Sequence, residues 1–388
     1  MKIIHTADWH IGKTIAGHNL LEDQRYYLKR LIRFLKEENA DVLVIAGDLY
    51  DRSVPSAEAV ELVDDIFTEI TTGLDIPILA ISGNHDSRQR LSFAGKLLQK
   101  QKLFLIGTLQ RNIQKVTLCD DVGLVNFYLL PFFQPADIRP LFPECAFKTP
   151  QEAYNTILKE TVDTLNRNER NILITHGFLA AAQTNDSDVI LSSESSVGGS
   201  DFICSEFFKD FDYVALGHLH APQSAGMDTV RYSGSLLKYS VDEANQEKKI
   251  VCVESHAPGK ISISDRKIPP LRDLRIVRGK FEELLNVGKN CSENTDDYVF
   301  AEITQSEPEL EAMTRLRNVY PNALGLKYVN HFTPVNVKTR NIETLRYQTP
   351  TEIFADFYRE ITGESLDSEK KILAEAVFRD VSEEESVR

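Results

Sequence analysis

Seven side chains that can bind metal ions stand directly after short apolar runs at five places in this 388-residue chain. The apolar runs are rich in β-branched residues and therefore predict strands. In open α/β sheets ligands gather where strands end, so polar side chains at these places are candidates for one common site. The seven candidates are Asp8, His10, Asp48, Asn84, His176, His218 and His220.

Each of these residues alone has an ordinary structural explanation. A single histidine after a strand is more often a hydrogen-bonded structural residue than a ligand, and Asp48 alone could be a turn residue or a helix N-cap. Asn84, which follows Gly83, could simply belong to a turn. The joint pattern is harder to attribute to coincidence, because all seven side chains follow predicted strands.

The donor atoms indicate which metals would suit the site. Oxygen and imidazole ligands without thiolates favour manganese, iron or zinc over copper or an iron–sulfur cluster. Seven ligands are too many for one ion, so the pattern predicts two. Paired ions lie about 3.5 to 4 Å apart and clamp the attacking and leaving oxygens of an in-line displacement. Asp48 is the candidate bridge, because its charge would hold both cations close and leave a bridging water acidic enough to attack phosphorus.

The elements that must position these residues alternate between strand and helix. Strands are expected at residues 3–4, 42–46, 78–81, 172–174 and 213–216. Apolar residues recur at intervals of three and four in two intervening stretches, which predicts amphipathic helices. These residues are Leu28, Leu31, Ile32 and Leu35, and then Val60, Val63, Phe67 and Ile70. The pattern predicts an α/β fold.

Composition sets limits on the class of protein. With 42% hydrophobic residues the chain can bury a substantial core and form two or three domains. No apolar run of 18 or more residues occurs, and the N-terminus lacks the features of a signal peptide, so we expect a soluble, unexported protein. The five cysteines are scattered and never form a CxxC pair, which favours packed thiols in a reducing cytoplasm. They are Cys119, Cys145, Cys204, Cys252 and Cys291.

The net charge of −14 argues against a chain that coats nucleic acid through bulk electrostatics, since phosphate-binding surfaces are usually basic. Much of the negative charge is local, however. Residues 349–388 contain five basic and eleven acidic residues, and a cluster of carboxylates that awaits metal ions would account for a little more. The charge therefore does not exclude a nucleic-acid substrate.

The motifs "DWH", "GDLYD", "GNHD", "THG" and "GHLH" together resemble those of the calcineurin-like metallophosphoesterases. With "LRDLRIVRGKFEEL" after them, their order and spacing are similar to those of the nuclease subunits of bacterial DNA repair complexes. The resemblance covers nearly the whole chain. It implies a sandwich of two central β-sheets flanked by helices, a smaller α+β capping domain and a C-terminal helical pair.

The resemblance also assigns the ligands to two ions. Asp8, His10, Asp48 and His220 would surround one ion, and the other would be held by Asp48, Asn84, His176 and His218. Two Mn²⁺ ions are implied, with Mg²⁺ or other divalent ions as possible substitutes.

His85 is left without a metal in this assignment. It follows Asn84 on a tight turn, so its imidazole can point into the cleft and stabilise the transition state or protonate the leaving oxygen. The alternative is a hydrogen bond to the backbone. Archaeal and eukaryotic nucleases of the superfamily tend to carry histidine in place of Asp51, whereas serine/threonine phosphatases carry an aspartate that orients the catalytic histidine. We therefore expect Asp51 to orient His85, although it could also be a turn residue or a helix cap.

Four segments are expected along the chain. The metallophosphoesterase domain should span residues 1–270, the capping domain 271–335, a linker 336–348 and a helical docking segment 349–388. In the last segment "TPTE" predicts a capping box with Thr349 as N-cap, followed by a helix with an apolar face. Residues 184–201 read as a polar surface loop, and "YSGS" at 232–235 could offer backbone N–H groups to a phosphate.

The resemblance implies a manganese-dependent DNA nuclease in repair, recombination and replication, active as a double-strand exonuclease and a single-strand or hairpin endonuclease. The implied partners are DNA ends and hairpins and a coiled-coil ATPase, through which alone ATP would act. A homodimer within a heterotetramer is also implied, and the helix at 57–70 or its neighbours is the candidate dimer face. No membrane partner is expected. The alternatives are a phosphatase or phosphodiesterase on small molecules or phosphoproteins, and a catalytically inactive scaffold that binds DNA or a partner.

Overall fold

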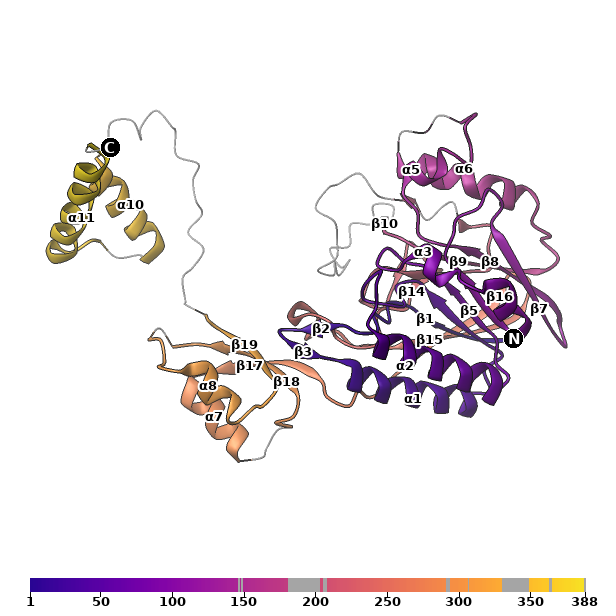
Figure 1. Cartoon of the computed structure of the whole chain (residues 1–388), viewed down its shortest axis with the longest axis horizontal. Helices are drawn as coiled ribbons and strands as arrows, with labels where there is room; N and C mark the ends of the chain where they lie inside the picture. The colour runs from indigo at the N-terminus through magenta and orange to yellow at the C-terminus, as the bar shows by residue number, and fades with distance from the viewer. Residues whose placement is uncertain are drawn as a thin grey trace. The chain divides into compact units, whose positions relative to one another are not determined.

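The computed structural model of the chain describes residues 1–145, 147, 149–180, 203–204, 208–290, 294–305, 307–329, 349–362 and 365–386 (Figure 1). The expected polar loop at 184–201, the expected linker at 336–348 and Cys291 lie outside the described residues, as do the side chain of Cys204 and residues 330–335 at the end of the expected capping domain.

The first of two large sheets has six strands and carries three of the five expected strand ends. Its order is β16-β15-β1-β4-β5-β6, formed by β16 (Lys260–Arg266), β15 (Ile250–Ala257), β1 (Lys2–Thr6), β4 (Val42–Ala46), β5 (Ile78–Ile81) and β6 (Leu103–Ile106). The four strands from β1 to β6 run parallel, and β15 lies antiparallel to β1. Strands β4 and β5 are buried on both faces, which explains their continuous apolar sequence.

The second sheet also has six strands and carries the other two strand ends. Its order is β13-β14-β12-β9-β8-β7, formed by β13 (Gln223–Ala225), β14 (Met227–Tyr232), β12 (Tyr213–Gly217), β9 (Arg170–His176), β8 (Gly123–Leu130) and β7 (Gln114–Asp120). The central strands β14, β12, β9 and β8 are parallel. Strands β9 and β12 are buried along their whole length.

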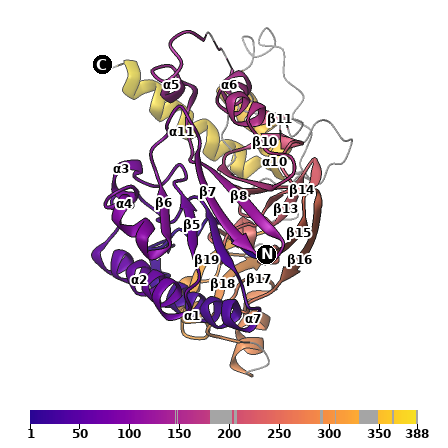
Figure 2. The ribbon, with the colours of Figure 1, turned by 90° about the vertical axis from the view of Figure 1, so that its right-hand side faces the viewer.

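The two sheets pack face to face, with helices on their outer faces (Figures 1 and 2). Apolar residues of both sheets, such as Val44 and Ile174, form the core between them. Helices α1 (Leu21–Glu37) and α2 (Ala57–Thr68) cover the first sheet. Helices α5 (Pro135–Ile138) and α6 (Pro150–Asp163) cover the second. The expected two-sheet α/β sandwich is confirmed.

Sequence signals explain where these helices begin. The side chain of Ser56 accepts a hydrogen bond from the N–H of Ala59 at the start of α2. The Thr149 side chain caps α6 in the same way, and Pro150 occupies the first helical position. Shorter elements complete this part of the chain: β2 (Thr14–Ile15), β3 (His18–Asn19), α3 (Arg88–Leu91), α4 (Gly95–Leu98), β10 (Leu179–Ala180), β11 (Ile203–Cys204), a π-helical turn (Glu69–Gly73) and the 3₁₀ helices Gln99–Gln101 and Val241–Glu243.

The described part of the C-terminal third contains a small sheet and further helices. The order β17-β18-β19 is formed by β17 (Leu274–Gly279), β18 (Tyr298–Ile303) and β19 (Ala323–Tyr328), together with α7 (Phe281–Lys289) and α8 (Ala312–Arg317). Helices α10 (Pro350–Thr362) and α11 (Ser368–Ser386) follow. Thr349 and Glu352 form the predicted capping box, in which each side chain accepts the backbone N–H of the other.

The chain divides into two compact units. The first comprises Met1–Val277, Val287–Ala301 and Met313–Gly325, and the second comprises Arg278–Asn286, Glu302–Ala312 and Leu326–Arg388. Residues of the expected capping domain thus fall in both units, and the boundaries expected from the sequence stay a prediction. Among the described residues no helix combines the length and apolar character needed to cross a membrane.

Candidate metal centre

The seven expected ligands come together where the parallel strands of both sheets end. Neighbouring parallel strands bring their carboxyl ends to the same edge, which places the residues after β1, β4 and β5 side by side. In the second sheet, His176 at the end of β9 pairs with Gly217 at the end of β12. The two edges meet, since the backbone N–H of His218 donates to both carboxylate oxygens of Asp8 at 3.0 and 3.1 Å.

Four of the expected ligands have an unusual backbone conformation. The φ angles of Asp8, His10, Asp48 and His218 are +51°, +45°, +51° and +116°, a region that residues other than glycine rarely occupy. Each such residue costs on the order of 1–3 kcal/mol and persists only where the surrounding structure imposes it. Backbone hydrogen bonds from Asp8 to Gly47 and from His10 to Asp48 tie the ends of β1 and β4 together in this conformation.

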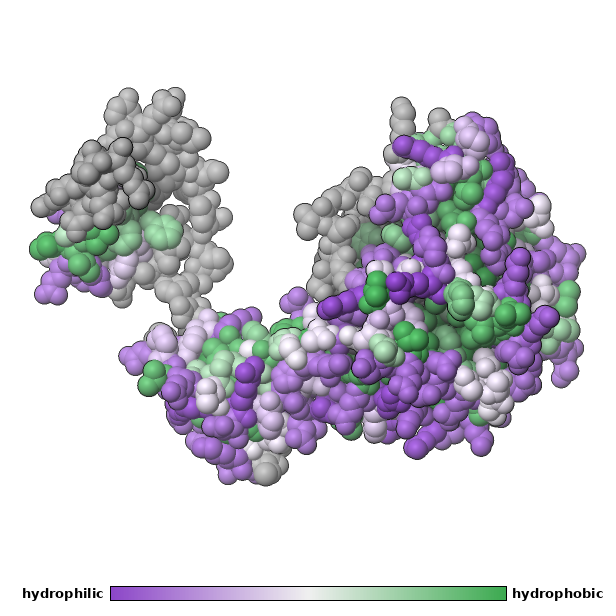
Figure 3. Space-filling view, viewed as in Figure 1, coloured by the Kyte–Doolittle hydropathy of each residue, from purple (hydrophilic) through white to green (hydrophobic). Residues whose placement is uncertain are grey.

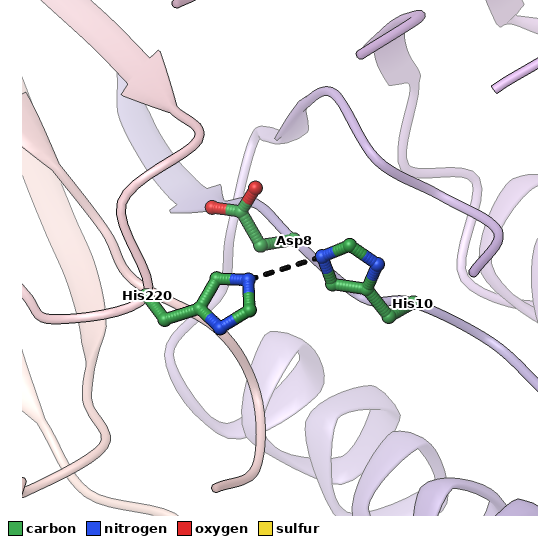
Figure 4. A group of neighbouring side chains, drawn as sticks. All are labelled: Asp8, His10 and His220. Carbon is green, nitrogen blue, oxygen red and sulfur yellow. Dashed lines mark hydrogen bonds between the residues drawn. The ribbon is translucent and has the colours of Figure 1, made fainter. Parts of the chain in front are cut away.

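One group of ligands consists of Asp8, His10 and His220 (Figure 4). All three are buried, and their ligand atoms lie within 4.8 Å of one another. The Nε2 atoms of His10 and His220 are 3.1 Å apart, so that both rings present the same nitrogen to one point in space. The carboxylate of Asp8 lies beside them in Figure 4.

A second group of ligands contains Asp48 itself. Asp8, Asp48 and His176 offer ligand atoms within 4.8 Å of one another. The amide oxygen of Asn84 lies 3.0 Å from Nε2 of His176 and 3.1 Å from Nδ1 of His218. The Nδ1–H of His176 donates to the carbonyl oxygen of Ala46 at 2.8 Å, which directs Nε2 into the site.

Asp48 belongs to the second group and also lies close to His10 of the first. Its Oδ2 atom lies 3.7 Å from Nε2 of His10 and 3.5 Å from Nε2 of His176. Its Oδ1 atom accepts the backbone N–H of His85 at 2.9 Å, which fixes the carboxylate. Asp48 therefore occupies the position that a bridging ligand requires.

His85 stands at the edge of the first group. Its ring centre is 4.8 Å from that of His10, and its Nδ1 atom lies 2.9 Å from the backbone carbonyl oxygen of Asp51. The sequence led us to expect a contact from the Asp51 carboxylate. That carboxylate forms an ion pair with Lys13 at 2.9 Å and offers an oxygen within 4.8 Å of nitrogens of His10 and His85. Asp51 thus contributes to the site through both its main chain and its side chain.

The two sheets approach so closely at the site that only glycine fits. A Cβ atom on Gly217 would lie 1.9 Å from the carbonyl oxygen of Ala46 and 2.8 Å from Nδ1 of His176. On Gly83 it would lie 2.1 Å from Oδ1 of Asp48. Both glycines in the motifs are therefore needed for close approach of the ligand-bearing segments.

Sequence reasoning did not assign a role to Asp86, the last residue of "GNHD". Its carboxylate accepts the backbone N–H groups of Gly83, Leu49 and Tyr50 and so joins the loops that carry Asn84 and Asp48. Burial, together with the charge of Asp48, raises the pKa of Asp86 to about 7 against the opposing effect of these hydrogen bonds. Its position in the motif "GNHD" was the signal that could have marked Asp86 as a residue of the site.

Two further residues near the site were missed because they belong to no motif. Glu243 accepts the Nδ1–H of His220 at 2.8 Å, and Lys248 forms an ion pair with Glu243 at 2.6 Å. Burial alone would raise the pKa of Glu243, but the hydrogen bond from His220 and the charge of Lys248 outweigh burial and lower it to about 2. A third residue outside the motifs, Gln24 of α1, donates to the carbonyls of Trp9 and His10 and to the hydroxyl of Tyr239, and supports the "DWH" loop.

The donor set fits a pair of divalent metal ions. It contains carboxylate, imidazole and amide groups but no thiolate, and the backbone or a carboxylate fixes the outer ring nitrogens of His176 and His220. The described residues provide three overlapping groups of ligand atoms, two of which contain Asp8, while the third consists of His10, Asp51 and His85. Phosphate ester hydrolysis is the chemistry that such paired sites support in a sandwich of this kind.

The fold and the site define a calcineurin-like phosphoesterase domain, and the family comparison agrees. Residues 1–222 match the family described as calcineurin-like phosphoesterase. Residues 270–362 match the family described as type 5 capsule protein repressor C-terminal domain. The structure of a dimetal phosphatase from Danio rerio is 12% identical in sequence and covers 70% of this chain and 98% of its own, with a TM-score of 0.41.

Two curated relatives match almost the whole chain. The SbcD component of the nuclease SbcCD from Staphylococcus saprophyticus is 34% identical over 390 aligned positions, which cover both proteins completely. The protein of the same name from Staphylococcus epidermidis is 33% identical over 375 positions, which cover 94% of this chain and 95% of the relative. The chain therefore belongs to the SbcD family of calcineurin-like phosphoesterases.

Proposed function

We propose that this chain is the nuclease subunit of an SbcC–SbcD type complex and hydrolyses DNA phosphodiester bonds with two Mn²⁺ ions. The position of Asp48 carries this proposal, because one carboxylate lies 3.7 Å from His10 and 3.5 Å from His176, the two rings that belong to different ligand groups. The names of the relatives at 33% and 34% identity support DNA as the substrate.

The ligands divide between the two ions. Asp8, His10, Asp48 and His220 would hold one ion. Asp48, Asn84, His176 and His218 would hold the other. Bound divalent ions supply positive charge to the phosphodiester and make a water molecule a better nucleophile. Mg²⁺ or another divalent ion with similar ligand preferences is an alternative to Mn²⁺.

In this proposal His85 acts at the leaving oxygen of the phosphodiester. A carbonyl oxygen only accepts hydrogen bonds, so the contact with Asp51 places a proton on Nδ1 and directs Nε2 away from it. As an imidazolium, with a second proton on Nε2, the ring beside His10 can stabilise the phosphorane-like transition state or give that proton to the leaving oxygen and become neutral. Lys13 and Asp51 provide a fixed ion pair next to it.

The proposed substrates are duplex ends, which would be cut by exonuclease action, and single strands or hairpins, which would be cut by endonuclease action. These activities serve DNA repair, recombination and replication. The test measures cleavage of a linear duplex and a hairpin duplex with Mn²⁺, in parallel with hydrolysis of p-nitrophenyl phosphate and cyclic nucleotides. Cleavage of both DNA substrates, lost on exhaustive chelation with EDTA, is expected.

Other outcomes identify the alternatives. Turnover of the small esters without DNA cleavage would make the protein a phosphatase or phosphodiesterase. DNA binding without two bound ions in excess Mn²⁺ would make it an inactive scaffold. Adding the candidate SbcC-type coiled-coil ATPase with and without ATP measures how far ATP, which we propose acts only through that partner, controls cleavage of the duplex.

The C-terminal helical pair is the proposed docking segment for the coiled-coil ATPase. Helices α10 and α11 pack on each other through Phe354 and Phe378, whose ring centres are 6.0 Å apart. Other apolar side chains of the pair remain exposed, and Figure 3 shows green, hydrophobic residues on the surface of the helical pair. They are Ile353, Phe357, Ile372, Leu373 and Val377. An amphipathic helical surface of this kind suits a helical partner.

A homodimer within a heterotetramer is the proposed assembly, with α2 as a candidate face. A cavity of about 670 Å³ lies between α2 and the segment that carries α3 and α4. Val60, Phe93 and Leu97 are exposed in this region. The expectation of packed thiols holds for Cys252, which is buried, but is wrong for Cys119 and Cys145, which are exposed. Free thiols at these three positions are in keeping with the cytoplasm as the proposed location.

A further inference from the structure

A buried carboxylate lies directly behind one of the proposed metal ligands. Glu243 is the last residue of the 3₁₀ helix Val241–Glu243, and none of its surface is exposed to solvent. Its Oε1 atom lies 2.8 Å from Nδ1 of His220, whose Nε2 faces His10 on the other side of the ring. The imidazole of His220 is therefore held between a carboxylate and the proposed ion.

Further contacts of Glu243 fix which oxygen faces His220. The Oε2 atom accepts a hydrogen bond from Lys248 at 2.6 Å and another from the backbone N–H of Tyr239 at 3.1 Å. Lys248 is itself buried and also donates to the carbonyl oxygen of His220 at 2.9 Å. With Oε2 occupied by two donors, Oε1 is directed toward the His220 ring.

Stability does not explain this arrangement. A buried ion pair loses about as much hydration energy as it gains in attraction, and replacing such a pair by well-packed apolar residues is often neutral or stabilising. Two buried charges behind a candidate ligand therefore call for a functional explanation. A carboxylate that accepts the outer N–H of a histidine fixes the tautomer and increases the basicity of the metal-binding nitrogen.

We propose that Glu243 is a positioning residue that holds His220 as the Nδ1–H tautomer and thereby directs the lone pair of Nε2 to the metal ion. The proposal rests on the proposed function insofar as it takes His220 to be a metal ligand. The backbone N–H of Tyr239 and Lys248 both hold the other carboxylate oxygen, Oε2, so that the Tyr239 contact remains when Lys248 is replaced.

The second proposed ion provides an internal reference. His176 is oriented by the neutral carbonyl oxygen of Ala46, which no side-chain substitution removes. His220, in contrast, is oriented by the carboxylate of Glu243. A change at Glu243 should therefore weaken the binding of one ion and leave the binding of the other unaffected.

Glu243→Gln is the decisive variant because it keeps the size of the side chain. Lys248 and the N–H of Tyr239 only donate, so the amide oxygen of glutamine will face them and its NH₂ group will face His220. Nδ1 of His220 must then accept, and the proton moves to Nε2, where it blocks metal binding. The side chain that replaces the carboxylate thus imposes the opposite tautomer.

Two measurements test this, neither of which depends on activity. Nitrogen chemical shifts of ¹⁵N-histidine-labelled, metal-free protein report the His220 tautomer, with the signal identified by comparison with His220→Gln. Titration with Mn²⁺ alone, followed by electron paramagnetic resonance, reports the affinity of each ion. We expect Glu243→Gln to carry the proton on Nε2 and to bind one of the two ions about 10- to 100-fold more weakly.

Lys248→Met is the matched control, because it breaks the same buried ion pair but leaves the carboxylate facing His220. It should keep the Nδ1–H tautomer and both ions. If Glu243→Gln does not fold, Glu243→Leu combined with Lys248→Met removes both charges and should lose the same single ion. The proposal would be overturned if Glu243→Gln and Lys248→Met lost Mn²⁺ affinity equally, or if the His220 tautomer were unchanged in Glu243→Gln. If the wild-type protein binds no Mn²⁺, the proposed function is overturned instead. The His220 tautomer in the metal-free protein then still tests the positioning role of Glu243.

Discussion

The Nδ1 atom of His85 lies 2.9 Å from the backbone carbonyl oxygen of Asp51, so a main-chain acceptor holds the proton of this nitrogen. Asp51→Asn keeps that carbonyl and changes only the side chain that pairs with Lys13. We expect Asp51→Asn to reduce kcat less than about tenfold, with an unchanged pH profile. His85→Gln should lower kcat by a factor of about 10² to 10⁴. The check is a pH series of DNA cleavage rates for both variants. A displaced profile in Asp51→Asn would show that the carboxylate orients His85 after all.

Asp48→Ala should remove cleavage altogether, because the shared carboxylate lies within 3.7 Å of ligands from both groups. His85→Gln is the comparison, since it should keep both ions. Elemental analysis after dialysis against Mn²⁺ measures the number of ions in each variant. Two ions in Asp48→Ala would contradict the bridging position, and loss of ions in His85→Gln would contradict the assignment of that residue outside the ligand set.

Gly217→Ala should disturb the junction of the two sheets. The added methyl group would lie 1.9 Å from the Ala46 carbonyl oxygen, which also orients His176. Overpacking of this kind typically lowers the free energy of unfolding by about 1–3 kcal/mol. Gly73→Ala is the control, because its nearest neighbour is the flexible side chain of Glu69 at 3.8 Å. Urea unfolding and Mn²⁺ titration should separate the two variants, and equal stability of both would refute the close approach.

His5 should make the protein less stable in mild acid. Burial lowers the pKa of His5 from its ordinary 6.5 to about 3, while the unfolded chain keeps the ordinary value. Between these two values the unfolded state binds a proton that the folded state does not, so the free energy of unfolding falls as pH falls, by at most about 1.4 kcal/mol per pH unit.

The measurement is urea unfolding of metal-free protein at pH 7 and pH 4.5 for wild type and His5→Gln. The variant should lose less stability between the two pH values. His256→Gln, on the exposed end of β15, controls for removal of a histidine as such. An identical pH dependence of wild type and His5→Gln would rule out His5 as a source of the acid sensitivity.

Truncation after Tyr347 should separate catalysis from partner binding. It removes α10 and α11 with their exposed apolar side chains, whereas all the proposed ligands precede residue 221. We expect both ions to stay bound, association with the SbcC-type ATPase to weaken, and ATP-dependent duplex cleavage to disappear. Phe357→Ser combined with Leu373→Ser is a milder variant that keeps the chain length. Full-affinity binding of the ATPase by the truncated protein would exclude the helical pair as the docking segment.

The sequence predicted the strands and their polar ends well because both signals are local. An apolar β-branched run defines a buried strand, and the residues after it lie at the edge of the sheet. The convergence of Asp48 and Asn84, which follow the neighbouring parallel strands β4 and β5, could therefore be anticipated before any coordinates. The capping box at Thr349 was predictable for the same reason.

Relationships between distant segments were not predictable in this way. Glu243 follows His220 by 23 residues and reaches it only because the 3₁₀ helix folds back over the strand end. The use of the Asp51 carbonyl in place of its carboxylate depends on a loop conformation that residue types do not define. The assignment of the C-terminal third to two compact units reflects packing among segments that lie far apart in the sequence.

The positive φ angles of Asp8, His10, Asp48 and His218 have a consequence for protein engineering. Glycine at any of these positions would relieve backbone strain, and selection for thermal tolerance alone would favour that exchange. Each exchange would also remove a proposed ligand. A directed-evolution experiment that rewards only heat resistance therefore exerts no selection to keep these ligands, and a stabilised SbcD-type protein is best obtained by keeping these four codons fixed.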